Sequence, residues 1–308
     1  MTGVRHLMLS VVAAVLALAL GLALGAGPVV GRTDASRGAR EDRLAAQAAR
    51  LQGRVAALED RARTDSRVVA ALAGPLTGGR LEGHSVLLVR TPGAHDNEVR
   101  RTRAALLGAG ASLTGELTVT ATYLDPDQAS APLEDLALRL VPPNVEFAPG
   151  STAIERVGTV LARATVAAEP PADPDQDGAE VIAGLKELGA VHLDGRPGQL
   201  AELAVLVTGA REKASAEPAV TALVAALDAG GAGALVAGPG LAPPAVGWAR
   251  TGNPGGASSV DSTDAPAGQV ALVLALVEQL AGGKGGYGAG TGATSVLPAS
   301  VRSPAPAD

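Results

Sequence analysis

The chain has 308 residues, a formal net charge of −6 and a hydrophobic content of 47%, which suits one sizeable domain with room for an anchor and a stalk. The acidic balance argues against a nucleic-acid-binding surface, because such a surface needs clustered Lys and Arg. Cysteine is absent, which excludes disulfides, thiolate metal sites and a cysteine nucleophile. Aromatic residues make up only 1% of the chain, so we expect a core of Val, Leu and Ala.

The N-terminal segment, residues 1–31, is dominated by an apolar run. Residues 7–30 contain no charged side chain, and roughly 20 apolar residues suffice to span a bilayer as a helix. This pattern predicts a single N-terminal transmembrane helix. The alternative is a signal peptide cleaved near Ala23, but the apolar region of a signal peptide is usually about 7–15 residues long. Arginines on both sides of the run leave the orientation open, since long domains translocate largely regardless of flanking charge.

Residues 39–72 show the periodicity of a helix with one apolar seam. Apolar residues recur at alternating intervals of four and three, interrupted by Asp65, at Leu44, Ala48, Leu51, Val55, Leu58, Ala62 and Val69. The spacing predicts a short coiled-coil stalk. An amphipathic helix lying on the domain fits the pattern equally well. The Gly- and Pro-containing residues 73–82 predict a break.

Residues 83–282 alternate between buried-type strands and helices. We expect strands at 85–90, 113–120, 203–208, 233–237, 246–250 and 258–260, and helices at 98–107, 132–140, 153–165, 179–188, 219–227 and 269–280. Thr152 and Glu155 form a capping-box pair at the start of one of these helices. Continuous apolar strands alternating with helices predict an α/β domain with a mostly parallel, doubly wound sheet of the Rossmann or flavodoxin type. Residues 283–308 form a Gly- and Pro-rich tail.

The best candidate site is the loop that follows the first strand, because open α/β sheets bind ligands at the carboxyl ends of their strands. The loop consists of Thr91, Pro92, Gly93, Ala94, His95 and Asp96. His95 beside Asp96 is a candidate metal pair or proton shuttle. The structural alternative is that Asp96 or Asn97 caps the next helix while His95 lies on the surface.

Other chemistry is poorly represented in the sequence. No phosphate-binding P-loop, strand-linked G-x-G-x-x-G, nucleophile elbow or Ser-His-Asp spacing is present, so we expect no enzyme. The only methionines are Met1 and Met8, and a Cu(I) site normally uses thiolate or thioether ligands. A Cu(II) site of imidazole and carboxylate has no recognisable spacing among the four histidines.

Several segments resemble the mycobacterial copper transport protein B family, and they follow one another along nearly the whole chain. The most specific are the strand and R-T-P-G-A-H-D loop that end at Asp96, and the tail that contains Gly286, Tyr287 and Gly288, followed by G-A-T-S-V. The segments V-L-V-T-G at 205–209 and S-V-D at 259–261 are also similar.

The resemblance implies an envelope or outer-membrane protein of copper efflux and homeostasis, with its soluble domain outside the cytoplasm. It makes copper a candidate ligand, although the histidines that the family can carry in its glycine-rich tail are missing here. The expected partners are the membrane and a second copy or an envelope protein bound through the stalk. A non-catalytic envelope scaffold is the alternative function.

Overall fold

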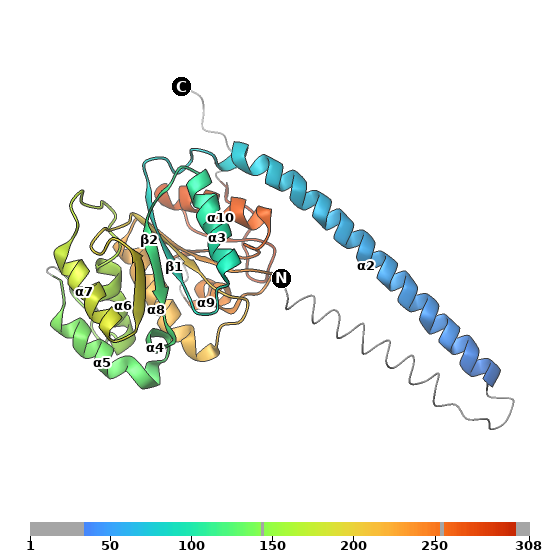
Figure 1. The fold of residues 1–308 in the computed structure, drawn as a ribbon, viewed down its shortest axis with the longest axis horizontal. Coiled ribbons are helices and arrows are strands. Elements are labelled where there is room, and N and C mark those ends of the chain that lie inside the picture. The colour runs from blue at the N-terminus through green and yellow to red at the C-terminus, as the bar shows by residue number, and fades with distance from the viewer. Residues whose placement is uncertain (1–33, 143–144, 253–255, 300–308) are drawn as a thin grey trace. The chain divides into compact units, whose positions relative to one another are not determined.

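The computed structural model describes residues 34–142, 145–252 and 256–299 (Figure 1). The chain divides into two compact units, residues 1–62 and residues 63–308. The predicted transmembrane helix is not supported, because none of the helices in the described ranges is long and apolar enough to cross a bilayer. The apolar run at residues 7–30 lies outside these ranges. The longest helix, α2 (Asp34–Thr77), carries charged residues throughout its 44 residues.

Helix α2 continues further than the sequence predicts. The expected break at residues 73–82 begins only after Thr77, although Pro75 lies within the helix. A proline in the last turn removes a single backbone hydrogen bond. The helical pattern is maintained beyond it, since the Thr77 hydroxyl donates to the Ala73 carbonyl at 2.8 Å and the Gly78 N–H donates to the Gly74 carbonyl at 2.8 Å.

The described strands form one mixed sheet in the order β3-β2-β1-β4-β5-β6-β7. All neighbours pair in parallel except β2 and β3, which are antiparallel. The strands are β1 (Ser85–Arg90), β2 (Ser112–Val119), β3 (Val191–Gly195), β4 (Leu203–Val207), β5 (Gly233–Ala237), β6 (Ser258–Val260) and β7 (Gly286–Tyr287). The mostly parallel sheet predicted from the buried-type strands is therefore present.

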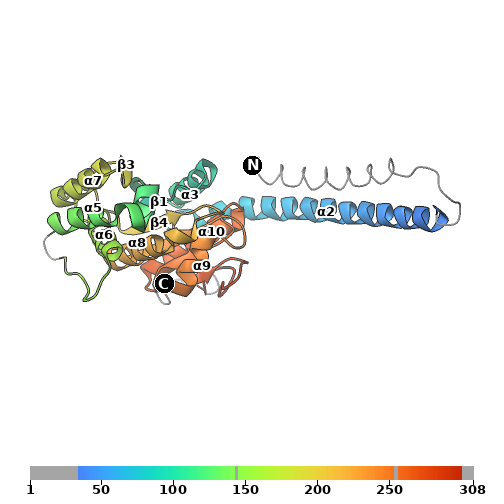
Figure 2. The same ribbon diagram turned by 90° about the horizontal axis from the view of Figure 1, so that it is seen from below.

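Helices cover both sides of this sheet (Figure 2). They are α3 (Asp96–Gly108), α4 (Ala121–Leu124), α5 (Pro126–Arg139), α6 (Ala153–Arg163), α7 (Gln176–Glu187), α8 (Glu217–Gly230), α9 (Pro244–Gly252) and α10 (Pro266–Leu280), with a short 3-10 turn, η1 (Ala214–Ala216). Alternate residues of one strand face opposite layers: Leu87 packs in the layer of α6 and α8, and Leu88 packs in the layer of α3 and α10. This explains why the central strands are apolar at every position.

Local predictions fail where the segments are short. Residues 246–250 were expected as a strand but belong to α9, because a segment of five residues does not distinguish a period of two from one of 3.6. Pro244, at the first position of the helix, favours the observed conformation. The short edge strands β3 and β7 were not predicted at all. The capping box is confirmed, since the Thr152 N–H donates to the Glu155 carboxylate at 2.6 Å.

Candidate functional site at the switch point of the sheet

The loop singled out by the sequence, Thr91 to Asp96, follows β1 at the point where the strand order reverses. From β1 the chain adds β2 and β3 on one side, and from β4 it adds β5, β6 and β7 on the other side, so the direction reverses between β1 and β4. Open α/β sheets bind their ligands in the crevice outside such a switch point. The facing loop follows β4 and begins at Thr208 and Gly209.

Glu212 fills the space between these two loops. The buried Thr91 hydroxyl donates a short hydrogen bond to the Glu212 carboxylate, and the Gly209 N–H donates to the same carboxylate oxygen at 3.0 Å. The Thr91 N–H donates to the Val207 carbonyl at 3.1 Å, which joins the end of β1 to the end of β4. The chain's own carboxylate therefore lies where a related fold would place a ligand.

Two glycines make this close approach of the loops feasible. A Cβ atom at Gly209 would lie 2.0 Å from the Gly93 carbonyl oxygen, and a Cβ atom at Gly93 would lie 2.5 Å from the Glu212 carboxylate. Both distances are shorter than any van der Waals contact. Glycine is required at position 209 because the obstacle there is backbone, whereas a side chain at position 93 would displace the Glu212 carboxylate.

His95 and Asp96 are both exposed at the edge of this crevice. His95 is the N-cap residue of α3, and its N–H donates to the Glu98 carboxylate at 3.0 Å. Asp96 is in the first turn and accepts a hydrogen bond from the Arg90 guanidinium at 2.9 Å. This hydrogen bond and the positive charge of Arg90 lower the pKa of Asp96. The pair is thus held at the surface, and its role as a metal site stays a prediction.

Metal-ligating side chains do not gather elsewhere in the described ranges, where no group of three or more His, Asp and Glu residues is close enough to hold an ion. One pair of potential metal ligands was not predicted from the sequence: His84 Nδ1 lies 2.7 Å from the Glu202 carboxylate. These residues are 118 positions apart and meet because each immediately precedes one of the neighbouring strands β1 and β4. Only the strand order brings them together.

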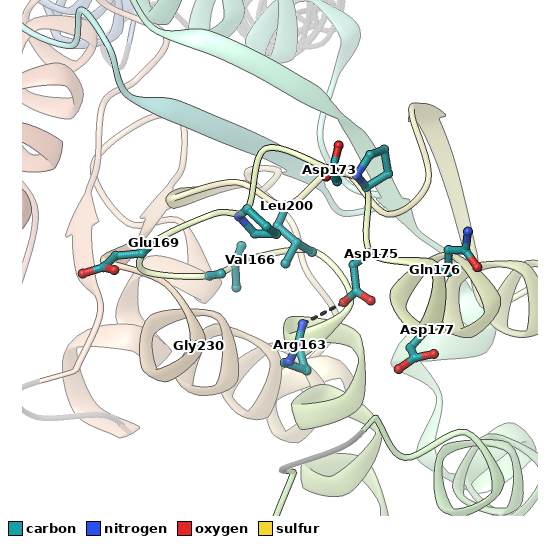
Figure 3. A pocket seen from close by; sticks show the side chains of 12 residues that line it. Arg163, Val166, Glu169, Asp173, Asp175, Gln176, Asp177, Leu200 and Gly230 are labelled. Atoms are coloured by element: carbon teal, nitrogen blue, oxygen red, sulfur yellow. Dashed lines mark hydrogen bonds and ion pairs between the residues drawn. The ribbon is translucent and has the colours of Figure 1, made fainter.

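A hollow lies between the end of α6 and the start of α7 (Figure 3). Carboxylates dominate its polar rim, but Asp175 forms an ion pair with Arg163 at 2.8 Å and is the N-cap residue of α7. Glu169, Asp173 and Asp177 are exposed around it. The rim of this hollow is therefore acidic and largely exposed to solvent.

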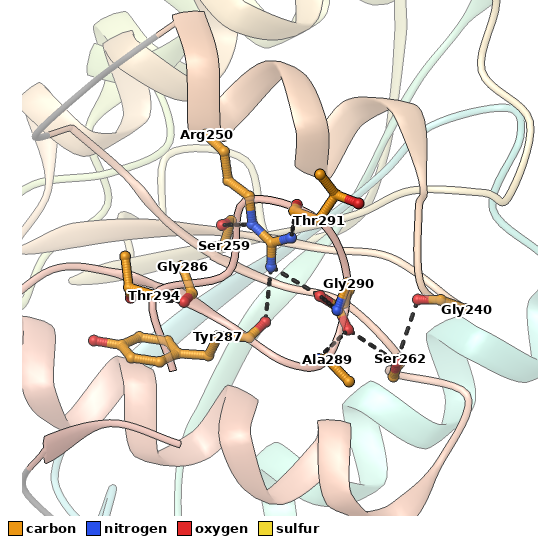
Figure 4. Close-up of polar contacts among 11 residues, drawn as sticks. Gly240, Arg250, Ser259, Ser262, Gly286, Tyr287, Ala289, Gly290, Thr291 and Thr294 are labelled. Carbon is orange, nitrogen blue, oxygen red and sulfur yellow. Dashed lines mark hydrogen bonds and ion pairs between the residues drawn. The ribbon is translucent and has the colours of Figure 1, made fainter. Parts of the chain in front are cut away.

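The glycine-rich tail is built into the sheet. Strand β7 pairs in parallel with β6, and the Arg250 guanidinium ties the two strands to α9 (Figure 4). Arg250 donates to the Asp261 carboxylate and to the Tyr287 carbonyl, both at 2.9 Å. It also donates to the Ser259 hydroxyl at 3.1 Å and to the Thr291 carbonyl at 2.9 Å. All its donor nitrogens therefore meet acceptors from the tail or from β6 and the residue that follows it.

Asp261 is the anionic centre of this arrangement and is fully buried. Besides Arg250, it accepts hydrogen bonds from the Ser262 hydroxyl at 2.9 Å and from the Ala289 and Gly290 N–H groups at 3.0 Å each. Burial alone would raise the pKa of Asp261, but these donors outweigh it and the pKa lies below its usual value. Sequence reasoning noted Asp261 only as part of a similar segment; its place at the carboxyl end of a buried strand was the signal to follow.

Tyr287, the central residue of the tail motif, points its ring back into the domain. Its side chain is nearly buried, and its hydroxyl donates to the Glu278 carboxylate on α10. Burial and the neighbouring carboxylate raise its pKa. Gly288 follows with a φ of 126°, and a Cβ atom there would lie 2.2 Å from the Asp261 carboxylate. Both glycines of the G-Y-G sequence thus lie against the buried ion pair, Gly286 against Arg250 and Gly288 against Asp261.

The loop before α3 and the glycine-rich tail both lie in a segment that matches one known protein family. A family model described as "Copper transport outer membrane protein, MctB" matches residues 1–298. This chain belongs to the MctB family. The match includes both the loop before α3 and the strand β7 with its glycines.

Among MctB proteins, the chain is 29% identical to "Copper transporter MctB" from Mycobacterium tuberculosis, over 96% of this chain and 99% of that protein. The identity to the Mycobacterium bovis protein of the same name is also 29% over the same shares. The Mycobacterium leprae protein is 30% identical over 73% of this chain and 76% of its own length. The chain is therefore similar to the M. tuberculosis and M. bovis copper transporters along nearly its full length.

Proposed function

We propose that this MctB-family chain contributes to copper efflux and homeostasis at the cell envelope, without being an enzyme. The observation that carries the proposal is the family match over residues 1–298. The family description names the outer membrane, which supports an envelope location with the α/β domain outside the cytoplasm. The filled switch-point crevice also favours a non-catalytic role, because Glu212 lies where an α/β enzyme would bind its ligand.

The chemistry of the chain favours contact with Cu(II) through imidazole and carboxylate groups. Residues 34–299 contain neither Met nor Cys, the soft ligands that Cu(I) prefers. We place the contact at His95 and Asp96, which are exposed next to each other. Asp96 must exchange the Arg90 guanidinium for the ion, so binding here is weak and copper passes through without being stored.

The first test is a titration of the full chain with Cu(II) against a competing chelator. We expect binding that His95→Ala weakens at least tenfold. The matched control is His192→Ala, which removes another exposed histidine from β3 of the same domain and should bind as the unmodified chain does. Equal binding by both variants would refute the assignment of His95.

The second test separates copper handling from other envelope roles. A host that lacks its own copy of the gene is complemented with the unmodified chain, with His95→Ala/Asp96→Ala, or with His192→Ala, and growth is measured against rising copper. We expect full tolerance with the unmodified chain and with His192→Ala, and reduced tolerance with the double variant. Unchanged tolerance in the double variant would leave copper to a partner protein.

The alternative function, a scaffold that recruits partners through its stalk and α/β domain, is favoured by one observation. Large apolar side chains of α2 are exposed, among them Leu51, Val55 and Leu58. If the chain is a scaffold, replacing these three residues by Ser abolishes function in the complementation assay while the His95/Asp96 variant is silent. The opposite pattern supports the copper contact.

A further inference from the structure

Four of the exposed apolar residues of α2 lie on one line along the helix. Leu44, Leu51, Val55 and Leu58 have exposed fractions of 60%, 54%, 47% and 66%. The intervals between seam positions alternate between four and three residues, which places their side chains on one face. Large apolar side chains exposed on one face of a helix mark a surface that binds another protein segment.

The residue types along this face indicate the number and direction of helices that fit it. In heptad notation the d positions are Leu44, Leu51 and Leu58, and the a positions are Ala48, Val55 and Ala62. Leucine at d combined with a β-branched residue at a favours parallel two-stranded coiled coils. The small Ala side chains at the remaining a positions allow two helices to approach closely.

The flanking charges point to the same arrangement. In a parallel, in-register pair, each g position faces the e position five residues later on the other helix. Arg54 is a g residue and Glu59 is the e residue five positions on, so each copy offers two opposite charges to its partner. Gln47 faces Gln52 by the same rule. An antiparallel pair would instead place g positions, Arg54 and Arg61, against one another.

We propose that residues 44–62 of α2 pair with the same residues of a second copy of this chain as a parallel, in-register, two-stranded coiled coil. Arg54 of each copy then pairs with Glu59 of the other. Asp65, at the next d position, ends the continuous apolar seam because two in-register carboxylates repel each other. Parallel pairing places the two α/β domains at the same end of the stalk.

Site-specific disulfide formation tests the register, since the natural chain has no cysteine to confuse the result. Single Cys residues replace Ala48 or Ala62 on the seam, or the matched Ala46 and Ala57 on the other faces of the helix. We expect full-length chains to form disulfide-linked dimers at Ala48→Cys and at Ala62→Cys, but not at Ala46→Cys or Ala57→Cys. Linkage at only one seam position would mean an antiparallel or shifted pair, and linkage at all four would mean random collision; either result overturns the proposal.

A charge exchange tests the pairing without relying on disulfides. Arg54→Glu and Glu59→Arg each place like charges across the interface, and we expect each to raise the dissociation constant of the full-length dimer about tenfold. The double variant Arg54→Glu/Glu59→Arg restores opposite charges and should dimerise as the unmodified chain does. Light scattering after size exclusion measures the dissociation. A monomeric unmodified chain, whose seam is then covered by another segment, or a double variant as weak as the single ones would overturn the proposal.

Discussion

Asp261 and Arg250 are the residues on which the C-terminal part of the domain depends most. The carboxylate is fully buried, and the guanidinium side chain is only 7% exposed. A buried ion pair stabilises a fold little compared with apolar residues of the same volume, but removing one partner leaves an uncompensated charge in a dry environment. The two residues come from α9 and from the end of β6, so a change in either one affects both elements.

Replacing Asp261 by Asn should therefore destabilise the domain strongly. We expect Asp261→Asn to lower the free energy of unfolding by about 3 kcal/mol, because Arg250 loses its counter-charge. Urea denaturation followed by the fluorescence of Trp248, the only tryptophan in the sequence, measures the loss. Asp173→Asn changes an exposed carboxylate in the same way and should alter stability by less than about 0.5 kcal/mol. Equal stability of the two variants would show that the pair is unimportant.

The same carboxylate makes stability depend on pH. Since the pKa of Asp261 is lowered in the folded chain, its contribution is present above the usual pKa of an aspartate and is lost as the pH falls through the folded-state value. The unmodified chain should lose its advantage over Asp261→Asn below about pH 4. Denaturation curves of both at several pH values test this, and a constant difference down to pH 2 would contradict it.

At the scale of elements, the connections after the strands impose stricter sequence requirements than the helices do. The loops after β1 and β4 touch each other through Gly93 and Gly209, whereas Gly247 in the middle of α9 has no heavy atom within 4 Å of the position of an added Cβ. The same substitution should consequently have opposite effects at two of these glycines.

Gly209→Ala should destabilise the domain by about 2 kcal/mol or more, since its Cβ would overlap the Gly93 carbonyl and the loops must separate. Gly247→Ala should stabilise it by about 0.5 kcal/mol, because alanine has the higher helix propensity and no neighbour obstructs it. Thermal unfolding by circular dichroism measures both. A Gly209→Ala variant as stable as the unmodified chain would mean that the two loops are not packed as described.

At the scale of the whole molecule, the tail closes one edge of the sheet. Strand β7 pairs with β6, and the residues after it supply the Ala289 and Gly290 N–H groups to Asp261 and the Thr291 carbonyl to Arg250. Removing this segment would leave Asp261 and Arg250 paired with each other but without the hydrogen bonds that the tail supplies to each of them. The α/β domain and the tail are thus expected to unfold as one unit.

Deletion of residues 285–308 should accordingly lower the midpoint of thermal unfolding by about 10 °C or more, in line with a loss of about 3 kcal/mol in a domain of this size. Deletion of residues 300–308 alone retains every contact of β7 named above and should shift the midpoint by less than about 2 °C. Similar midpoints for the two deletions would contradict a structural role for the tail.

The sequence by itself determined the α/β class, the central strands and most helices of the domain. Apolar runs at 203–207 and 233–237 are buried on both faces, and such continuous runs are typical of the central strands of a parallel sheet. The Thr152 capping box and the apolar helix α10 could also be predicted, because helix caps and long apolar helices are local features of the sequence. The position of the candidate loop before α3 followed from the same local reading.

Only the tertiary structure decided how the carboxylates are used. Glu212 fills the switch point, Asp261 binds the backbone of the tail, and Glu202 contacts His84. In each case the partner lies at least 28 residues away in the sequence. Such contacts depend on strand order and on the close approach of loops, which no local periodicity encodes. The strand expected at 246–250 shows the converse limit: a short pattern read alone does not reveal the conformation that its surroundings select.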